Sequence, residues 1–257
     1  MLTFTKSELQ QKIEKISRNM EKIKSEISEN TSPIFVELLG TPKSGKTTLL
    51  KSLKNLFANN GIQIFTRRET AEYNPVAKDS KQYDLWMVLE LFKNLLDDIS
   101  NKQGQIVIYD RGILDRLTWL ENAVEKGTMT SQDLERIKGL YSLESVKNGY
   151  KPISLGFITS PELSIQRKGS IGRFVNPQTL TAYNRTLLEK QGEISALSSS
   201  YSLTKTDDYQ GRIENFILDL SSDLTDQISK QLEEKKEEKS KGQAVKAISD
   251  SDGKDER

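Results

Sequence analysis

The sequence contains no cysteine and no histidine among its 257 residues. The absence of cysteine excludes disulfide bonds and metal sites built from thiolates. The absence of histidine removes the commonest general base and the commonest zinc ligand. Any acid–base chemistry in this protein therefore has to use Asp, Glu, Lys or Tyr side chains.

An excess of charge of either sign is also missing, because 38 Lys and Arg residues nearly balance 37 Asp and Glu residues. A balanced chain has no global field that would attract nucleic acid or an anionic membrane, so we expect neither partner. No apolar run approaches the length of a membrane-spanning helix, and the N-terminus lacks the apolar core of a signal peptide. We therefore expect a cytoplasmic protein.

The most informative feature that is present is the segment GTPKSGKTT at positions 40–48, which directly follows an apolar run at 34–39. It fits the phosphate-binding pattern G-x-x-x-x-G-K-[ST], in which glycines let backbone N–H groups and a helix N-terminus face phosphate oxygens. Lys46 would place its charge between the β- and γ-phosphates of ATP, and the Thr47 hydroxyl would bind Mg²⁺. The expected nucleotide-binding residues are Gly40, Lys43, Ser44, Gly45, Lys46, Thr47 and Thr48.

Between residues 31 and 229 the pattern alternates strands and helices, which is typical of a parallel sheet with right-handed crossovers. We expect strands at 34–39, 62–66, 105–109, 153–158 and 201–205. Helices are expected at 45–58, 83–99, 114–125, 131–147, 177–198 and 211–229. The predicted fold is therefore a P-loop NTPase three-layer α/β sandwich with about five parallel strands.

The two ends differ in composition from this central part. Residues 1–30 carry an apolar seam with heptad spacing, formed by Leu9, Ile13, Ile16, Met20, Ile23 and Ile27. The seam predicts either a coiled coil that would make a homodimer or a single amphipathic helix lying on the core, and the sequence favours neither. Residues 230–257 are charged and almost free of apolar side chains, so we expect a fraying helix end followed by a disordered tail.

Functional side chains in a parallel sheet lie beyond the carboxyl ends of the strands. Asp110 and Arg111 end the third predicted strand, where a carboxylate that organises Mg²⁺ and an arginine that reaches phosphate are expected. In the alternative without a catalytic role, Asp110 caps the next helix and Arg111 pairs with Asp115.

The second predicted strand is followed by Arg67, Arg68 and Glu69. Glu69 could accept a proton from a hydroxyl of the substrate, whereas the arginines could hold an anionic acceptor such as a monophosphate. Glu72 is a competing candidate for the proton acceptor, and a solvated loop is the alternative without a function. Side chains alternate along a strand, so one arginine at most shares the face of Glu69, which slightly favours a neutral, nucleoside-like acceptor.

After the fourth predicted strand, Arg167 and Arg173 bracket the segment RKGSIGR. Its two glycines, Gly169 and Gly172, predict a mobile basic lid rather than a stiff helix. A lid that brings arginines onto the transferring phosphoryl group would exclude water and stabilise the developing charge. The alternative is a positively charged surface loop.

These motifs, in this order and spacing, resemble the P-loop kinases of the thymidylate kinase, deoxynucleoside kinase and nicotinamide-riboside kinase group. The resemblance covers residues 32–220 and rests on GTPKSGKTT, RRET, YDRG with an aspartate beyond, and the stretch SPE to QRKGSIGR to AYNRTLLE. The chain departs from the group at Thr70, where relatives often have proline, and in a lid with less charge.

The resemblance implies an ATP site with Mg²⁺ and a role for each motif. The phosphate loop would bind ATP, the strand-end pair would organise the metal and phosphate, and the loop at 206–209 would lie by the adenine. The catalytic residues that the resemblance implies are Lys46, Glu69, Asp110, Arg111, Arg167 and Arg173, with Thr47 and Asp110 as metal ligands.

The sequence therefore predicts a small-molecule kinase that moves the γ-phosphoryl group of ATP to a nucleoside-like or nucleotide acceptor. The alternative is a P-loop ATPase that acts as a switch or assembly factor with a protein partner, to which the heptad seam and the charged tail lend support. An arginine-bearing lid and an acceptor carboxylate distinguish the kinase, because a switch needs neither.

Overall fold

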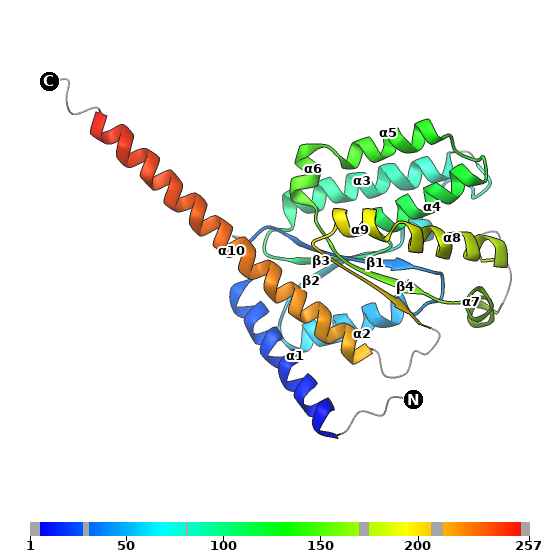
Figure 1. Ribbon diagram of the computed structural model, residues 1–257, viewed down its shortest axis with the longest axis horizontal. Helices are drawn as coiled ribbons and strands as arrows, with labels where there is room; N and C mark the ends of the chain where they lie inside the picture. The colour runs from blue at the N-terminus through cyan, green and yellow to red at the C-terminus, as the bar shows by residue number, and fades with distance from the viewer. Residues whose placement is uncertain (1–5, 28–30, 81, 170–174, 207–212, 253–257) are drawn as a thin grey trace.

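The computed structural model describes residues 6–27, 31–80, 82–169, 175–206 and 213–252. Five strands form one parallel sheet in the order β2, β3, β1, β4, β5. The strands are β1 (Ile34–Gly40), β2 (Ile64–Arg67), β3 (Ile106–Asp110), β4 (Ile153–Ile158) and β5 (Ser200–Lys205). Figure 1 shows helices on both faces of this sheet, so the predicted three-layer α/β fold with a P-loop is confirmed.

Strand β1 lies in the middle of the sheet and is buried along its whole length. Its side chains alternate between the two helical layers. Ile34, Val36 and Leu38 pack in the layer of α1 (Lys6–Glu26), α2 (Lys46–Asn59) and α10 (Ile213–Asp252). The alternate positions face the other layer, where Phe35 packs with α3 to α6 and Leu39 packs with α4, α8 and α9.

That second layer contains α3 (Tyr83–Asn101), α4 (Ile113–Glu125), α5 (Ser131–Tyr141), α6 (Glu144–Gly149), α8 (Pro177–Glu189) and α9 (Gln191–Leu197). Two short elements lie at the carboxyl edge of the sheet: the 3-10 helix η1 (Thr70–Glu72) after β2, and α7 (Pro161–Lys168) after β4. The carboxyl ends of β1 to β4 thus converge on one edge, which is where the predicted functional residues were expected to meet.

Two helices that were predicted as single elements are each broken in two. The predicted helix at 131–147 consists of α5 and α6, with Leu143 extended between them (φ −59°, ψ 133°). The break lets Val146 and Tyr150 reach the core around Phe35. The predicted helix at 177–198 is α8 followed by α9, which lets Ile194 pack in the same core as α8.

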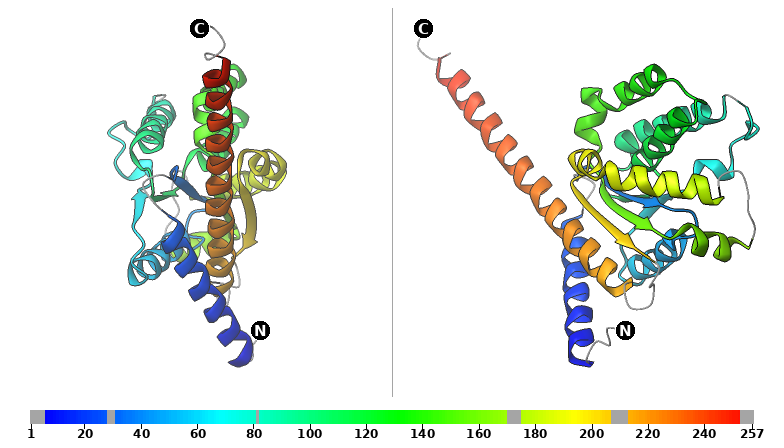
Figure 2. Two further views of the ribbon diagram at one scale, coloured as in Figure 1. Left: turned by 90° about the vertical axis from the view of Figure 1, so that its left-hand side faces the viewer. Right: turned by 45° about the vertical axis from the view of Figure 1, so that its right-hand side comes forward.

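The two ends of the chain lie side by side, because α1 runs along α10 (Figures 1 and 2). Lys12 Nζ donates to Asn215 Oδ1 at 2.6 Å, and Asn19 Nδ2 donates to Ser221 Oγ at 2.9 Å. The pairing advances in the same direction on both helices, as in a parallel coiled coil. The later part of the heptad seam, including Met20, is buried in this contact. The helix therefore lies on its own core, which is one of the two alternatives that the sequence left open.

Helix α10 continues to Asp252, whereas the prediction had a helix to residue 229, then a fraying helix end and a disordered tail. The helix continues because Glu, Lys and Gln, which dominate this stretch, are strong helix formers. Lys230 Nζ also lies 4.0 Å from Glu234 Oε1, one turn further along the helix. No helix in the described parts of the chain is long and apolar enough to cross a membrane.

Candidate active site

The phosphate loop begins where β1 ends and has the backbone that its glycines were expected to allow. Gly40 has φ 134°, and a Cβ atom there would lie 2.0 Å from the Phe157 carbonyl oxygen, so no other residue fits. Lys43 and Gly45 also have positive φ angles, of 61° and 102°, and α2 starts directly afterwards at Lys46. The loop therefore wraps around a helix N-terminus, a geometry that binds anions.

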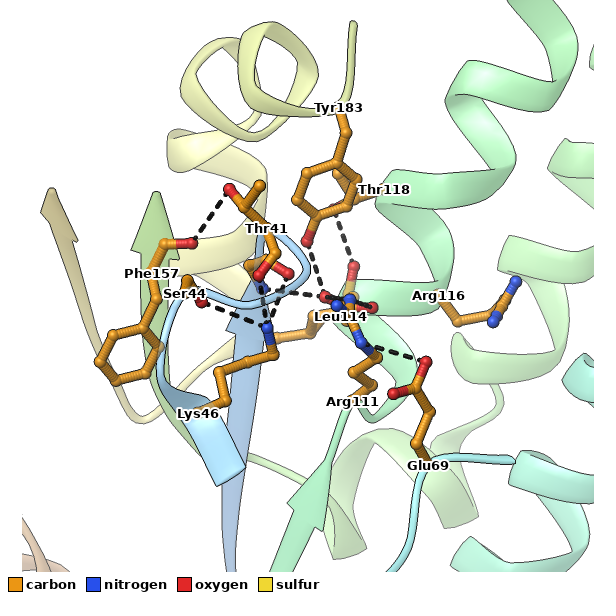
Figure 3. Close-up of polar contacts among 12 residues, drawn as sticks. Thr41, Ser44, Lys46, Glu69, Arg111, Leu114, Arg116, Thr118, Phe157 and Tyr183 are labelled. Carbon is orange, nitrogen blue, oxygen red and sulfur yellow. Dashed lines mark hydrogen bonds and ion pairs between the residues drawn. The ribbon is translucent and has the colours of Figure 1, made fainter. Parts of the chain in front are cut away.

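Lys46 is buried inside this loop. Its Nζ donates to the carbonyl oxygens of Gly40 and Thr41 at 3.0 and 2.8 Å and to Ser44 Oγ at 3.3 Å (Figure 3). Burial, and secondarily the charge of Arg111, lowers the pKa of Lys46 to about 7. A phosphate in the loop would bring the negative charge that this ammonium group lacks.

A hydroxyl group in the first turn of α2 lies beside a carboxylate at the end of β3. Thr47 Oγ1 donates to Asp110 Oδ2 at 3.3 Å. Burial raises the pKa of Asp110 above its ordinary value, and the charges of Lys46 and Arg111 oppose that effect. Among the described residues no three acidic side chains gather as a preformed metal site. Magnesium bound with ATP needs only one or two protein ligands, because phosphate and water supply the rest, so Thr47 and Asp110 fit it.

Arg111, which follows β3, is buried and projects from a left-handed backbone with φ 66°. Its NH1 donates to both carboxylate oxygens of Asp115, at 3.1 and 2.9 Å. Its Nε lies 3.2 Å from Glu69 Oε1, a charge contact that lacks the alignment of a hydrogen bond. The pairing with Asp115 was the structural alternative for this arginine. Arg111 makes that pair and also contacts Glu69 at the cavity (Figure 3).

The two candidates for the proton acceptor are Glu69, which precedes the 3-10 helix η1, and Glu72, which is its last residue, and both line the cavity. Glu69 is one third exposed and is the one in contact with Arg111. Glu72 is exposed and lies a full turn further along the chain. The geometry therefore favours Glu69.

The segment after β4 is more ordered in structure than the sequence indicated. Arg167 and Lys168 belong to helix α7, which ends at Gly169, so the prediction of a non-helical lid is wrong for these two residues. Arg167 NH1 donates to the Lys43 carbonyl at 3.2 Å and its NH2 to the Thr206 carbonyl at 3.4 Å. Arg173 and residues 207–209 lie outside the described residues.

These elements enclose a cavity of about 930 Å³. The phosphate loop, Asp110, Arg111 and Arg167 line one end of it. The other end is lined by side chains of α3 and α4, among them Tyr83, Asp84, Arg116, Trp119 and Asn122, and by Lys126, which directly follows α4. A cavity of this size has room for a nucleotide and a small second molecule.

Comparison with known proteins identifies this architecture. Three similar solved structures are all described as deoxyadenosine kinase from M. mycoides. The structure with bound dCTP has a TM-score of 0.55 and 17% sequence identity, and the match covers 74% of this chain and 100% of that chain. The structure with bound dATP has a TM-score of 0.55 and 17% identity over 73% and 99% of the two chains. The structure with the products dCMP and a flexible dCDP has a TM-score of 0.54 and 16% identity over 74% and 100%.

The chain has the fold of a P-loop nucleoside kinase. This fold is the one that the sequence motifs resembled. No protein-family description matches the sequence, and no curated protein sequence matches it either. The likeness is therefore one of fold at low sequence identity.

Sequence analysis did not predict the end of the cavity that α3 and α4 line. Arg116 is buried, its NH1 lies 3.2 Å from Asp84 Oδ1, and its Nε has no hydrogen-bond partner. Arg116, Trp119 and Asn122 line the cavity from α4 at spacings of three. Such spacings put side chains on one helix face, so this pattern was the signal that could have found them.

The two arginines before Glu69 do not join the site. Arg67 donates to Asp98 at 2.6 Å and to Asp97 at 2.8 Å, both on α3. Arg68 is exposed and is not among the described residues that line the cavity. The suggestion that this pair holds an anionic acceptor is therefore not supported by its position.

Proposed function

We propose that this protein is a Mg-ATP-dependent kinase that transfers the γ-phosphoryl group of ATP to a hydroxyl group of a small, nucleoside-like acceptor. The observation that carries the proposal is the placement of Glu69. It lines the same cavity as the phosphate loop and the side chains of α3 and α4, with Arg111 beside it. The nucleoside kinase fold of the deoxyadenosine kinases supports the choice of acceptor.

Each residue near the phosphates has a role that follows from its position. The loop amides and Lys46 would hold the β- and γ-phosphates, and Thr47 with Asp110 would hold Mg²⁺. Bound magnesium neutralises charge on the phosphate oxygens. Arg111 and Arg167 can stabilise the charge that develops as the phosphoryl group moves, since both line the same end of the cavity.

Glu69 would act as the general base, a role that histidine often has in enzymes and that no histidine can have in this chain. The acceptor hydroxyl oxygen forms the new P–O bond, the bond from the γ-phosphorus to the β-phosphate oxygen breaks, and the hydroxyl proton passes to the Glu69 carboxylate. ADP and the phosphorylated acceptor leave. A side chain that is one third exposed can then return this proton to water.

An ATPase switch, the alternative function, does not need space for a second small molecule beside the nucleotide. The α3 and α4 end of the cavity, where the buried Arg116 pairs with the partly exposed Asp84, supports a small-molecule acceptor instead. The base or head group of that acceptor is identified by testing a panel of substrates.

The test is ATP turnover with a panel of nucleosides and nucleoside monophosphates. We expect a nucleoside to stimulate ADP formation and to be phosphorylated, with Lys46→Ala inactive. Glu69→Gln keeps the shape of the side chain and loses its basicity, so we expect phosphorylation to fall by roughly a hundredfold or more. Glu72→Gln is the matched control and should change the rate by less than about threefold.

Two results would contradict the proposal. If only monophosphates are phosphorylated and Glu69→Gln is nearly silent, the acceptor is a phosphate and not a hydroxyl. If ATP is hydrolysed at one rate whatever acceptor is present, the protein is an ATPase and the kinase proposal is wrong.

A further inference from the structure

Asp115, in the first turn of α4, joins three segments that are far apart in the sequence. Its carboxylate is fully buried. Oδ1 accepts the Gly40 amide at 2.9 Å and the Tyr183 hydroxyl at 2.6 Å. Both of its oxygens accept from Arg111 NH1. One side chain thus contacts the first residue of the phosphate loop, the arginine at the end of β3, and α8.

A buried carboxylate is costly unless its charge is paired and its oxygens accept hydrogen bonds. Asp115 meets both conditions. Although burial opposes it, the charges of Arg111 and Lys46 and the hydrogen bond from Tyr183 hold the pKa of Asp115 below its ordinary value. The group is therefore a fixed anion, and it faces two cations that line the phosphate end of the cavity.

The backbone around Asp115 is arranged to keep it in place. Its own amide donates to Glu37 Oε1 at 2.8 Å. Gly112 makes room for that contact, because a Cβ there would lie 2.7 Å from the Glu37 carboxylate. Two hydrogen bonds therefore join the start of α4 to β1. The Asp115 amide donates to Glu37, and the Gly40 amide donates to the Asp115 carboxylate.

Asp115 also connects to the acceptor end of the cavity. The Tyr183 ring stacks on Trp119 with centroids 4.5 Å apart and an interplanar angle of 30°. Trp119 lines the cavity beside Arg116. The same carboxylate is therefore in contact with the phosphate loop directly and with a wall of the acceptor chamber through one tyrosine.

We propose that Asp115 is a positioning residue that keeps Arg111 in the geometry that binds phosphate. It touches no reacting group and acts through Arg111. Without the charge of Asp115, Arg111 would have only Glu69 as a carboxylate partner among the described residues, and its NH1 group would lose the charged partner to which it donates. The effect on catalysis rests on the proposed function, whereas the effect on ATP binding does not.

The experiment is a double-mutant cycle between Asp115→Asn and Arg111→Ala. The cycle shows whether Asp115 affects ATP binding through Arg111 or independently of it. Affinity for a non-hydrolysable ATP analogue with Mg²⁺ is measured by calorimetry, beside kcat with the best acceptor and the melting temperature. We expect each single variant to bind the analogue about tenfold more weakly and the double variant to bind no worse than Arg111→Ala alone. Asp219→Asn, on the exposed part of α10, is the matched control for loss of a carboxylate.

Tyr183→Phe covers the case in which Asp115→Asn does not fold. It keeps the ring on Trp119 and removes one donor from Asp115, so we expect analogue affinity to fall about threefold in the wild-type background. In the Arg111→Ala background the same change should have no effect. Equal losses in both backgrounds, or multiplied losses in the Asp115 cycle, would overturn the inference.

The two proposals fail in different ways. A wild-type protein that binds the analogue and phosphorylates no acceptor contradicts the proposed function, while the affinity cycle still decides the role of Asp115. Unchanged affinity in a folded Asp115→Asn variant contradicts the positioning role, whatever the acceptor panel shows.

Discussion

At the scale of single residues, the site is built around charged groups that are buried with specific partners. Glu37 is one that the proposed chemistry does not use. It points from β1 into the layer of α4, and it accepts from the Tyr150 hydroxyl at 2.6 Å as well as from the Asp115 amide. Burial, partly offset by these hydrogen bonds, raises the pKa of Glu37 to about 7. The proton on this group is therefore linked to folding.

This linkage predicts a pH dependence of stability that one substitution removes. The folded-state pKa of Glu37 is above its unfolded value of 4.5. Its stabilising contribution to the free energy of unfolding is therefore fully present below pH 4.5 and is lost as the pH rises to about 7. At about 1.4 kcal/mol per pKa unit, the loss is roughly 3 kcal/mol at most. Glu37→Gln should therefore gain stability relative to the wild type between pH 5 and pH 8.

Urea denaturation at the two pH values measures this difference. Glu135→Gln, on the exposed face of α5, is the matched control and should show the same pH dependence as the wild type. A Glu37→Gln variant whose free energy of unfolding follows the wild type in parallel at both pH values would contradict the assignment.

At the scale of elements, α7 is docked on the phosphate loop as a helix. Ser164 Oγ donates to the Pro42 carbonyl at 2.6 Å, and Arg167 bonds the Lys43 carbonyl. Helix α7 thus covers the loop from the β4 side and places a guanidinium group next to the site of the phosphates. Arg167 is exposed, so it can leave these carbonyl oxygens for a phosphoryl group.

Arg167→Ala tests whether this helix takes part in the reaction. If the guanidinium group contacts the phosphoryl group mainly in the transition state, kcat should fall by on the order of a hundredfold with little change in ATP affinity. The exposed neighbour Gln166→Ala is the matched control and should keep the wild-type rate. Equal catalytic constants for all three proteins would make α7 a purely structural cover. A comparable role for Arg173 stays a prediction.

At the scale of the whole molecule, the two ends of the chain form one unit. The α1 seam is buried against α10 at Met20 and Ile23, which are 1% and 0% exposed, while Ile13 is 48% exposed. The deeper part of the seam shares its core with Leu224 and Ile228 of α10. A dimer built along the entire seam would have to expose these side chains first.

We therefore expect α1 to act on stability rather than on self-association. Ile23→Ala should lower the free energy of unfolding by roughly 2 to 5 kcal/mol, because it leaves a cavity in the core. Ile13→Ala, on the exposed part of the same seam, should change it by less than about 0.5 kcal/mol. Denaturant unfolding measures both values, and sedimentation equilibrium of the same samples measures the mass. A mass that falls from dimer to monomer in Ile13→Ala would show that the seam joins two copies.

The amino-acid sequence by itself determined the phosphate loop, the class of the sheet and the residues at the strand ends. Each of these is encoded in a short stretch. The spacing of Gly40, Gly45 and Lys46 specifies the loop, and apolar runs with turn residues between them specify buried parallel strands. Asp110 and Glu69 could be placed near the loop because the carboxyl ends of parallel strands meet at one edge.

Only the tertiary structure decided which partner each charged or apolar side chain has. Arg67 is bound to Asp98, Asp115 is bound to Gly40 at a distance of 75 positions along the chain, and the α1 seam is covered by a helix about two hundred positions away. The acceptor chamber arises in the same way, from α3 and α4 together. Such pairings depend on how elements pack across the sheet, and the sequence around one partner does not identify the other. For that reason the phosphate loop could be predicted from its motif, whereas the sequence showed the spacing of side chains on α4 and the seam of α1 without showing what each of them faces.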